Sequence, residues 1–354
     1  MEAMDQAERK DTAQHALVYV GIAVSVVVVL VLLWYAIDVV LLAFIGILLA
    51  ILLRSPADWL VERFGWREGP ALALVGVLAL VLLASGAVFF GRGIVGQALA
   101  LIDRIPEILQ TFKDQLAQSE LGSRLVALAE SSGLFAGGDG SQFLGRGLGL
   151  IGSTFGAIAN VMIVVFFAVF MAAQPREYVD GVLHLVARPK RARARKVLHE
   201  IGHVLRRWLV GQSVLALIVA LITGIGLALL GAPFPMALGM LAGLMEFVPY
   251  IGPFVAAIPA ILVGFAEGPQ LALYIALLFL GVQMLESYVA APLVQHEAVH
   301  LPPAVILFSQ VLMGVIVGAL GVAVATPLAA AVMVAVSMLY VEDALGDKNA
   351  KPGA

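Results

Sequence analysis

Residues 208–230, WLVGQSVLALIVALITGIGLALL, decide the fold class. The stretch contains no charged side chain, and as one α-helix it would be about 34 Å long at 1.5 Å per residue. That length suits the hydrocarbon core of a bilayer, which is about 30 Å thick. The stretch therefore predicts a helix that spans a membrane.

The remainder of the chain has the same character. Of its 354 residues, 62% are hydrophobic and only 13% are charged, against about 25% charged residues in a typical soluble domain. A water-soluble fold could not bury so large an apolar fraction, so we expect an all-α integral membrane protein. The absence of cysteine excludes disulfides and thiolate metal sites, and the net charge of -3 argues against a nucleic-acid partner.

Changes in hydropathy divide the chain into segments. As one helix, residues 17–53 would be about 55 Å long, which exceeds the thickness of the hydrocarbon core, so we expect a hairpin near Trp34–Asp38; one long tilted helix is the alternative. The expected order is a cytoplasmic tail (1–16), three spans (17–90), an extracytoplasmic helical insertion (91–150), a span (151–173), a basic cytoplasmic linker (174–207), a transport core with broken helices (208–340) and a cytoplasmic tail (341–354). Within the insertion, Leu99, Ile102, Ile105, Leu109, Phe112 and Leu116 recur at helical spacing.

The basic linker indicates the orientation in the membrane. Residues 174–207 are rich in arginine and lysine, and short basic loops remain in the cytoplasm. The loop at 54–69 holds three arginines and lies two spans away, on the same side. We therefore expect both termini inside and the 91–150 insertion outside. A basic cluster can also bind nucleic acid or anionic lipid; we interpret this one as an orientation signal with weak lipid contact.

The second half of the chain differs from the first because its apolar runs are broken. No lysine or arginine occurs from Trp208 to Asp347, whereas prolines and glycines interrupt 235–266 and 303–340. Broken helices are tolerated at membrane depth where protein or a water-filled cavity satisfies the freed backbone groups. An unbroken span followed by a broken segment occurs twice, as in the repeats of secondary transporters. The broken segments are either re-entrant hairpins or full spans.

Glu246 lies beside the first break, in the sequence MEFVPYIGP. A carboxylate near the bilayer centre costs at least about 2.5–3.5 kcal/mol, and this half of the chain offers no basic partner. The break at Pro249, Tyr250, Gly252 and Pro253 exposes backbone carbonyls that can coordinate a cation or bind a polar solute. The functional interpretation is a coupling carboxylate for protons or cations. The alternative is a glutamate in a loop that faces water.

A second polar group lies in QMLESY, where Gln283 and Glu286 share one helical face. Such a stripe faces a cavity or forms hydrogen bonds between helices, and the sequence leaves both interpretations open. Gln212 in the preceding span and Pro327 in the last broken segment complete the candidates for substrate or ion binding.

Two stretches match the H-E-x-x-H zinc pattern of metalloproteases, in which two histidines share a helical face. They supply His199 and His203, and His296 and His300. Arginines surround the first pair, and the second lies in a short segment between prolines, so we expect no metal and no enzymatic activity; a membrane zinc metalloprotease remains the alternative. No G-x-x-x-x-G-K-[ST] phosphate loop is present, so active transport must draw on an ion gradient or a partner.

Several motifs resemble one family of bacterial membrane proteins, the autoinducer-2 exporter family, over most of the chain and most strongly over about 208–330. They are Trp208-Leu209-Val210-Gly211-Gln212, Gly231-Ala232-Pro233-Phe234-Pro235, Phe247-Val248-Pro249-Tyr250-Ile251-Gly252-Pro253, Val299-His300-Leu301-Pro302-Pro303 and the run from Gly318 to Leu328.

The resemblance implies about eight membrane segments in a bacterial inner membrane and a homo-oligomer. Members are linked to export of the quorum-sensing signal autoinducer-2, and some to exchange of sodium or lithium for protons. We therefore expect a secondary transporter, either an exporter of a small solute or a cation/proton antiporter, with Na+ or H+ as coupling ion and no other cofactor. A passive channel is the further alternative. The expected partners are the lipid bilayer and a small-molecule or cation substrate.

Overall fold

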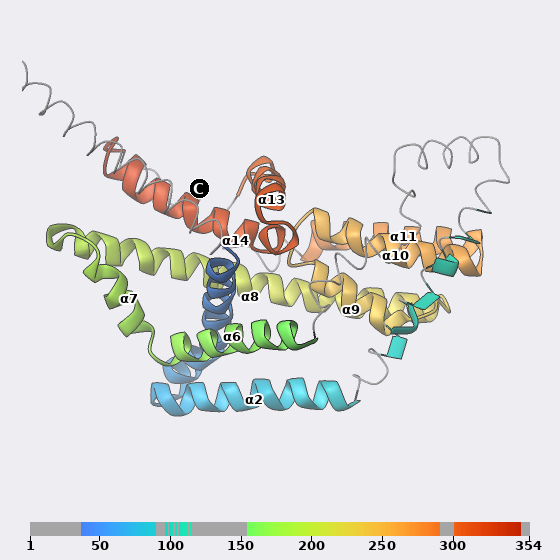
Figure 1. Ribbon diagram of the computed structural model, residues 1–354, viewed down its shortest axis with the longest axis horizontal. Helices are drawn as coiled ribbons and strands as arrows, with labels where there is room; N and C mark the ends of the chain where they lie inside the picture. Colours follow the sequence, from blue (N-terminus) through green and yellow to red (C-terminus); the bar gives the residue numbers. More distant parts are fainter. Residues whose placement is uncertain are drawn as a thin grey trace, which may run out of the picture.

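The computed structural model describes residues 37–89, 154–290 and 301–347, together with scattered positions between 96 and 114. All regular structure within these residues is helical (Figure 1), which confirms the all-α prediction for this part of the chain. The principal helices are Ile37–Phe64, α2 (Glu68–Phe89), α6 (Thr154–Ala173), α7 (Pro175–His184), α8 (Arg191–Leu229), α9 (Pro235–Met245), α10 (Ile251–Glu267), α11 (Pro269–Leu285), α13 (Pro303–Val317) and α14 (Ala319–Val336). A 3-10 turn, η1 (Arg188–Lys190), precedes α8, and π-helical turns η2 (Glu286–Ala290) and η3 (Ser337–Glu342) follow α11 and α14.

The described helices have the length and composition of membrane segments. Four of them are long and apolar enough to cross a bilayer, and α6 with α7 makes a fifth if that pair, bent by 90°, is one span. Shorter apolar helices include α9, α10 and α13. This pattern is that of an integral membrane protein with several crossings, as the composition predicts. The expected tail at 1–16, most of the 91–150 insertion and residues 34–36 of the predicted hairpin lie outside the described residues; Asp38, at the end of that hairpin, lies in the first turn of the helix Ile37–Phe64.

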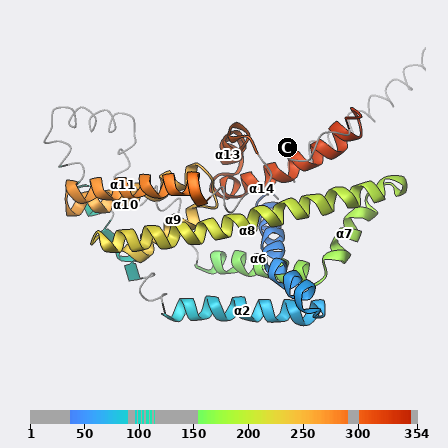
Figure 2. The ribbon, with the colours of Figure 1, turned by 180° about the vertical axis from the view of Figure 1, so that it is seen from behind.

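Helix α8 is the longest element and organises the rest. Helices α9, α10 and α11 gather around its carboxyl-terminal half, and both views show this arrangement (Figures 1 and 2). Helix α9 packs directly along α8, and α11 packs along α10. Helix α14 packs against α8 as well and forms a hairpin with α13. The α8–α11 group is thus a small bundle, and its interior holds the candidate site.

Two apolar clusters hold α8 at its two ends. In the first, Val204 and Leu209 of α8 pack with Ala330 and Val334 of α14 and with Leu48. In the second, the carboxyl-terminal end of α8 packs with α9, α10 and α11; its buried members include Leu227, Leu238, Ala260 and Ile275. Within a bilayer such clusters stabilise the fold through close van der Waals packing rather than through the removal of apolar surface from water.

The expected insertion begins by packing onto the second cluster. Leu101 and Ile108, seven positions apart, are buried among its residues. Gln97 accepts hydrogen bonds through Oε1 from the backbone N–H groups of Met236 and Ala237, which lie in the first turn of α9. That turn has unpaired N–H groups, so Gln97 satisfies two of them. Neither Leu101 nor Ile108 belongs to the predicted apolar pattern; of that pattern the structure describes only the side chain of Leu99, which is exposed.

The basic linker is helical rather than extended. Helix α8 begins at Arg191, not at Trp208, and its 39 residues make it about 58 Å long. Arginines of this region form ion pairs with acids from other elements: Arg193 with Glu342 and Asp343, Arg195 with Asp180, and Arg206 with Asp58. The charge pattern indicates where a membrane boundary falls, but no proline interrupts the helix there.

Candidate functional site

The sequence around Pro249 ends one helix and begins the next within a tight turn. Helix α9 ends at Met245, and residues 246–250 form the turn before α10. Tyr250 has a φ of 67°, a left-handed conformation that costs free energy in a residue other than glycine. Gly252 is required because a Cβ at that position would collide with the backbone oxygen of Met245. The turn places Glu246 at its first position, facing the interior of the bundle.

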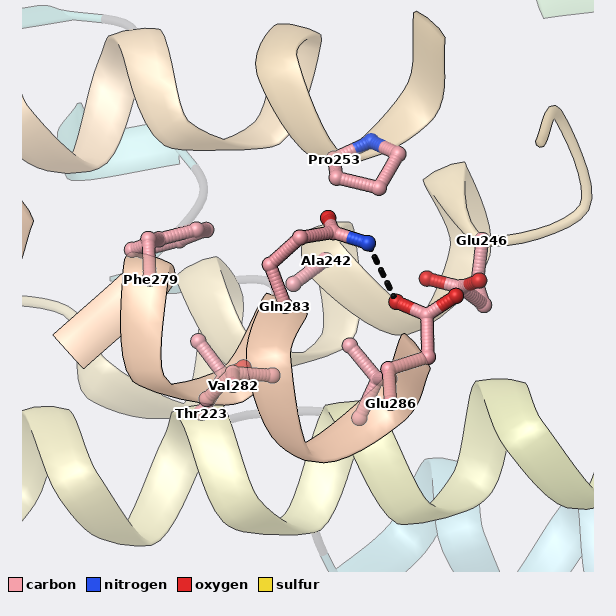
Figure 3. Close-up of a pocket in the computed structure, with 9 residues that line it drawn as sticks. Thr223, Ala242, Glu246, Pro253, Phe279, Val282, Gln283 and Glu286 are labelled. Atoms are coloured by element: carbon pink, nitrogen blue, oxygen red, sulfur yellow. Dashed lines mark hydrogen bonds between the residues drawn. The ribbon is translucent and has the colours of Figure 1, made fainter. Parts of the chain in front are cut away.

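A small pocket lies between α8, α9, α10 and α11, beside this turn (Figure 3). Its lining combines apolar side chains with four polar ones and contains no lysine or arginine. The lining residues are Val219, Thr223, Ala242, Glu246, Pro253, Phe279, Val282, Gln283 and Glu286. The pocket has room for about one water-sized occupant, so in this conformation it admits an ion or a water molecule but no organic solute.

Two carboxyl groups face each other in this pocket. Figure 3 shows the side chains of Glu246 and Glu286 pointing toward one another, from the turn after α9 and from the start of η2. Gln283 donates a hydrogen bond through Nε2 to Oε2 of Glu286 at 3.1 Å. Glu246 is only 2% exposed, and its Oε2 has no hydrogen-bond partner among the described residues. Two carboxylates so placed repel each other unless a proton or a cation lies between them.

Thr223 supplies a further buried oxygen to the pocket. Its side chain is fully buried, and its Oγ1 has no hydrogen-bond partner among the described residues. A buried hydroxyl without a partner costs about 1–3 kcal/mol. The wall of the pocket therefore holds two oxygens without a partner among the described residues, on Thr223 and Glu246, as well as the carboxyl group of Glu286 and the amide of Gln283. Hard cations prefer oxygen ligands.

The predicted site residues fall into two groups. Glu246, Pro253, Gln283 and Glu286 line the pocket together. The others do not line it. Gln212 donates a hydrogen bond to the backbone carbonyl of Glu246, and the carbonyl of Pro249 accepts one from Gln310. Tyr250 is 45% exposed, Gly252 lies in the first turn of α10, and Pro327 is buried inside α14.

Sequence reasoning did not identify Thr223, Gln310 or Thr326. Thr223 carries a usable signal, because it follows Gln212 by about three helical turns and so shares its face. Gln310 and Thr326 are fully buried polar residues, and Nε2 of Gln310 lies 2.8 Å from the Pro249 oxygen and 3.5 Å from the Thr326 hydroxyl. Their partners are distant in sequence, so no local pattern announces them.

The zinc patterns receive no support from the described residues. His199 and His203 lie on α8, where both side chains are exposed. No group of three or more histidine, aspartate or glutamate side chains is arranged to hold a metal within the part of the chain that the structure describes. His296 and His300 lie outside that part.

Comparisons with known proteins place this bundle in a family. The chain is 23% identical to the Escherichia coli K12 protein YhhT over 333 residues, which cover 92% of this chain and 91% of the relative. It is 26% identical to the Bacillus subtilis protein YueF over 186 residues, and that match spans about half of either chain. A second Bacillus subtilis protein, YrrI, is also matched over about half its length.

The names of these relatives propose a role in transport and specify no substrate. The model of the AI-2E family transporters matches residues 23–340, which include every described helix of the bundle and both carboxylates of the pocket. The chain belongs to the AI-2E family of transporters.

Proposed function

We propose that this protein is a secondary transporter that exchanges a small monovalent cation for protons, and that the Glu246–Glu286 pair is the coupling site. The observation that carries the proposal is the pair of facing carboxyl groups without a basic neighbour. Two ionised carboxylates that face each other in this pocket repel each other, so the pair must hold either a proton or a metal cation. Alternating occupancy by the two is the chemistry of an antiporter.

The size of the pocket favours an ion over an organic substrate. A solute of the size of autoinducer-2 does not fit a space for about one water molecule, whereas a dehydrated Na+ does. The neighbouring break between α9 and α10 is also typical of secondary transporters, whose cation sites lie beside broken helices. If the substrate is an exported solute, the same pair would bind the protons that drive its export, and the solute would require a more open conformation.

The test is ion flux in proteoliposomes, with a pH-sensitive dye inside and a sodium gradient across the bilayer. The variants are Glu246→Gln and Glu286→Gln, and Glu267→Gln is the matched control because that carboxylate is exposed at the end of α10. We expect sodium-driven proton movement in the wild type and in Glu267→Gln, and its loss in both pocket variants. Unchanged exchange in the pocket variants would remove the coupling assignment.

The other candidate activities give different results in the same assay. A passive channel would carry sodium without moving protons against their gradient. An exporter of an uncharged signal would show no sodium-driven proton movement, and efflux of radiolabelled autoinducer-2 would then be lost in Glu246→Gln. A metalloprotease would require bound zinc that disappears on His199→Ala or His296→Ala.

A further inference from the structure

The turn that carries Glu246 is held from outside by two buried glutamines. Gln212, on α8, is 2% exposed and donates through Nε2 to the backbone carbonyl of Glu246. Gln310, on α13, is fully buried and donates through Nε2 to the carbonyl of Pro249 at 2.8 Å. The two bonds therefore fix the first and the fourth residue of the turn at 246–250.

The turn combines backbone bonds of its own with a strained residue. Phe247 donates to the Leu244 oxygen and Val248 to the Met245 oxygen, and at the start of α10 Ile251 donates to the Pro249 oxygen and Gly252 to the Val248 oxygen. Tyr250 is held in a left-handed conformation that only surrounding structure can maintain. A glutamine amide is costly to bury unless it forms hydrogen bonds. The two buried amides are therefore held in place by the hydrogen bonds that they donate to this turn.

The origin of the two glutamines adds a structural consequence. Gln212 belongs to the helix that carries Thr223 of the pocket, whereas Gln310 belongs to the α13–α14 hairpin, which contributes no residue to the pocket lining. The hydrogen bond from Gln310 therefore connects that hairpin to the turn. A movement of the hairpin would displace the backbone of the turn and, with it, the side chain of Glu246.

We infer that Gln212 and Gln310 are positioning residues, which hold the turn at 246–250 so that the carboxyl group of Glu246 faces Glu286. The role of the pair in coupling rests on the proposed function, but the geometry can be tested without transport. Neither glutamine touches the occupant of the pocket; each acts through a backbone carbonyl of the turn.

The first experiment measures the geometry in the full-length protein, which contains no native cysteine. The double variant Glu246→Cys, Glu286→Cys brings two thiols to the positions of the facing carboxyl groups, and mild oxidation should join them rapidly. Adding Gln212→Met or Gln310→Met removes one donor while nearly conserving side-chain volume. We expect either change to slow cross-linking by about tenfold.

The matched controls are the adjacent serines. Ser213 bonds to the Leu209 oxygen and Ser309 to the Ile306 oxygen, each within its own helix. Ser213→Ala and Ser309→Ala should leave the rate of cross-linking within about twofold of the parent. Thermal unfolding of every variant separates a loss of position from a loss of fold. If one methionine variant does not fold, the other tests the inference, because the two lie on different helices.

The second experiment measures transport by the single variants in proteoliposomes. Gln212→Met and Gln310→Met should raise the half-saturating sodium concentration by about tenfold and change the maximal rate less, whereas the serine variants should match the wild type. Cross-linking at the parent rate in both methionine variants would overturn the inference, whatever the transport result. Slowed cross-linking together with no exchange in the wild type would support the positioning role and remove the proposed function.

Discussion

Gly239 of α9 lies directly against Gly224 of α8. A Cβ atom built on Gly239 would stand 2.6 Å from the Gly224 Cα, closer than real Cβ contacts allow. One turn further along, a Cβ on Gly243 would stand 2.6 Å from that of Ala220. Helices in membranes gain close packing from small residues spaced in this way. The contact holds α9 along α8 and so positions the turn that follows it.

This contact predicts the effect of one added methyl group. Gly239→Ala should lower the stability of the fold by about 1–3 kcal/mol, because the backbones of α8 and α9 must move apart. Gly281→Ala is the matched control, since a Cβ on Gly281 of α11 meets nothing within 4 Å. It should leave stability unchanged or raise it by up to about 1 kcal/mol through helix propensity. Thermal unfolding in detergent measures both, and equal melting temperatures would contradict the packing argument.

A second prediction concerns the anchoring of the carboxyl-terminal end. Arg193 of α8 bonds to Glu342, to Asp343 and to the backbone oxygen of Met338, and it is partly buried. Arg193→Gln should therefore accelerate hydrogen exchange across residues 337–343, by a factor that corresponds to about 1 kcal/mol.

The control for this prediction is Arg195→Gln, which breaks a more exposed pair with Asp180 on α7. Exposed pairs contribute little, so exchange at 337–343 should remain as in the wild type. High salt should reduce the difference between the two variants, because the Arg193 pairs are themselves partly exposed. An equal effect of both variants would indicate a general loss of stability rather than a local anchor.

A third prediction tests the orientation in the membrane. Lys190→Cys in η1 and Leu99→Cys at the start of the expected insertion each place one thiol at an exposed position of a cysteine-free chain. If basic loops lie inside, an impermeant maleimide applied to intact cells should label Leu99→Cys at once. It should label Lys190→Cys only after permeabilisation. The reversed pattern would invert the proposed topology.

The sequence predicts the fold class and the carboxylates of the site because each depends on a large free energy of transfer between water and an apolar environment. Long uncharged apolar runs have no place in a soluble fold, and a carboxylate in such a run is costly enough to need a function. Glu246 is predicted on that ground, and Gln283 and Glu286 are predicted from their shared helical face; the structure brings all three to one pocket.

The remaining features depend on tertiary placement. The bond from Gln310 to the Pro249 oxygen joins residues 61 positions apart, and nothing near either residue predicts it. The start of α8 at Arg191 was not anticipated, because a charge pattern marks a membrane boundary rather than the end of a helix. Thr223 could have been found from its spacing to Gln212, but a threonine in an apolar helix usually bonds to its own backbone, and only the structure shows that this one does not.

Thr223 is the residue at which stability and transport should separate. Its hydroxyl is fully buried in the wall of the pocket and has no hydrogen-bond partner within the described part of the chain, a cost that an occupant of the pocket would offset. Thr223→Val keeps the shape and removes the hydroxyl, so the melting temperature should stay the same or rise. The half-saturating sodium concentration should rise by about tenfold, because the cation loses one oxygen ligand. Thr223→Ser restores the oxygen and should restore sodium binding. If Thr223→Val loses stability and keeps wild-type sodium dependence, the hydroxyl serves the packing of α8 and is no ligand.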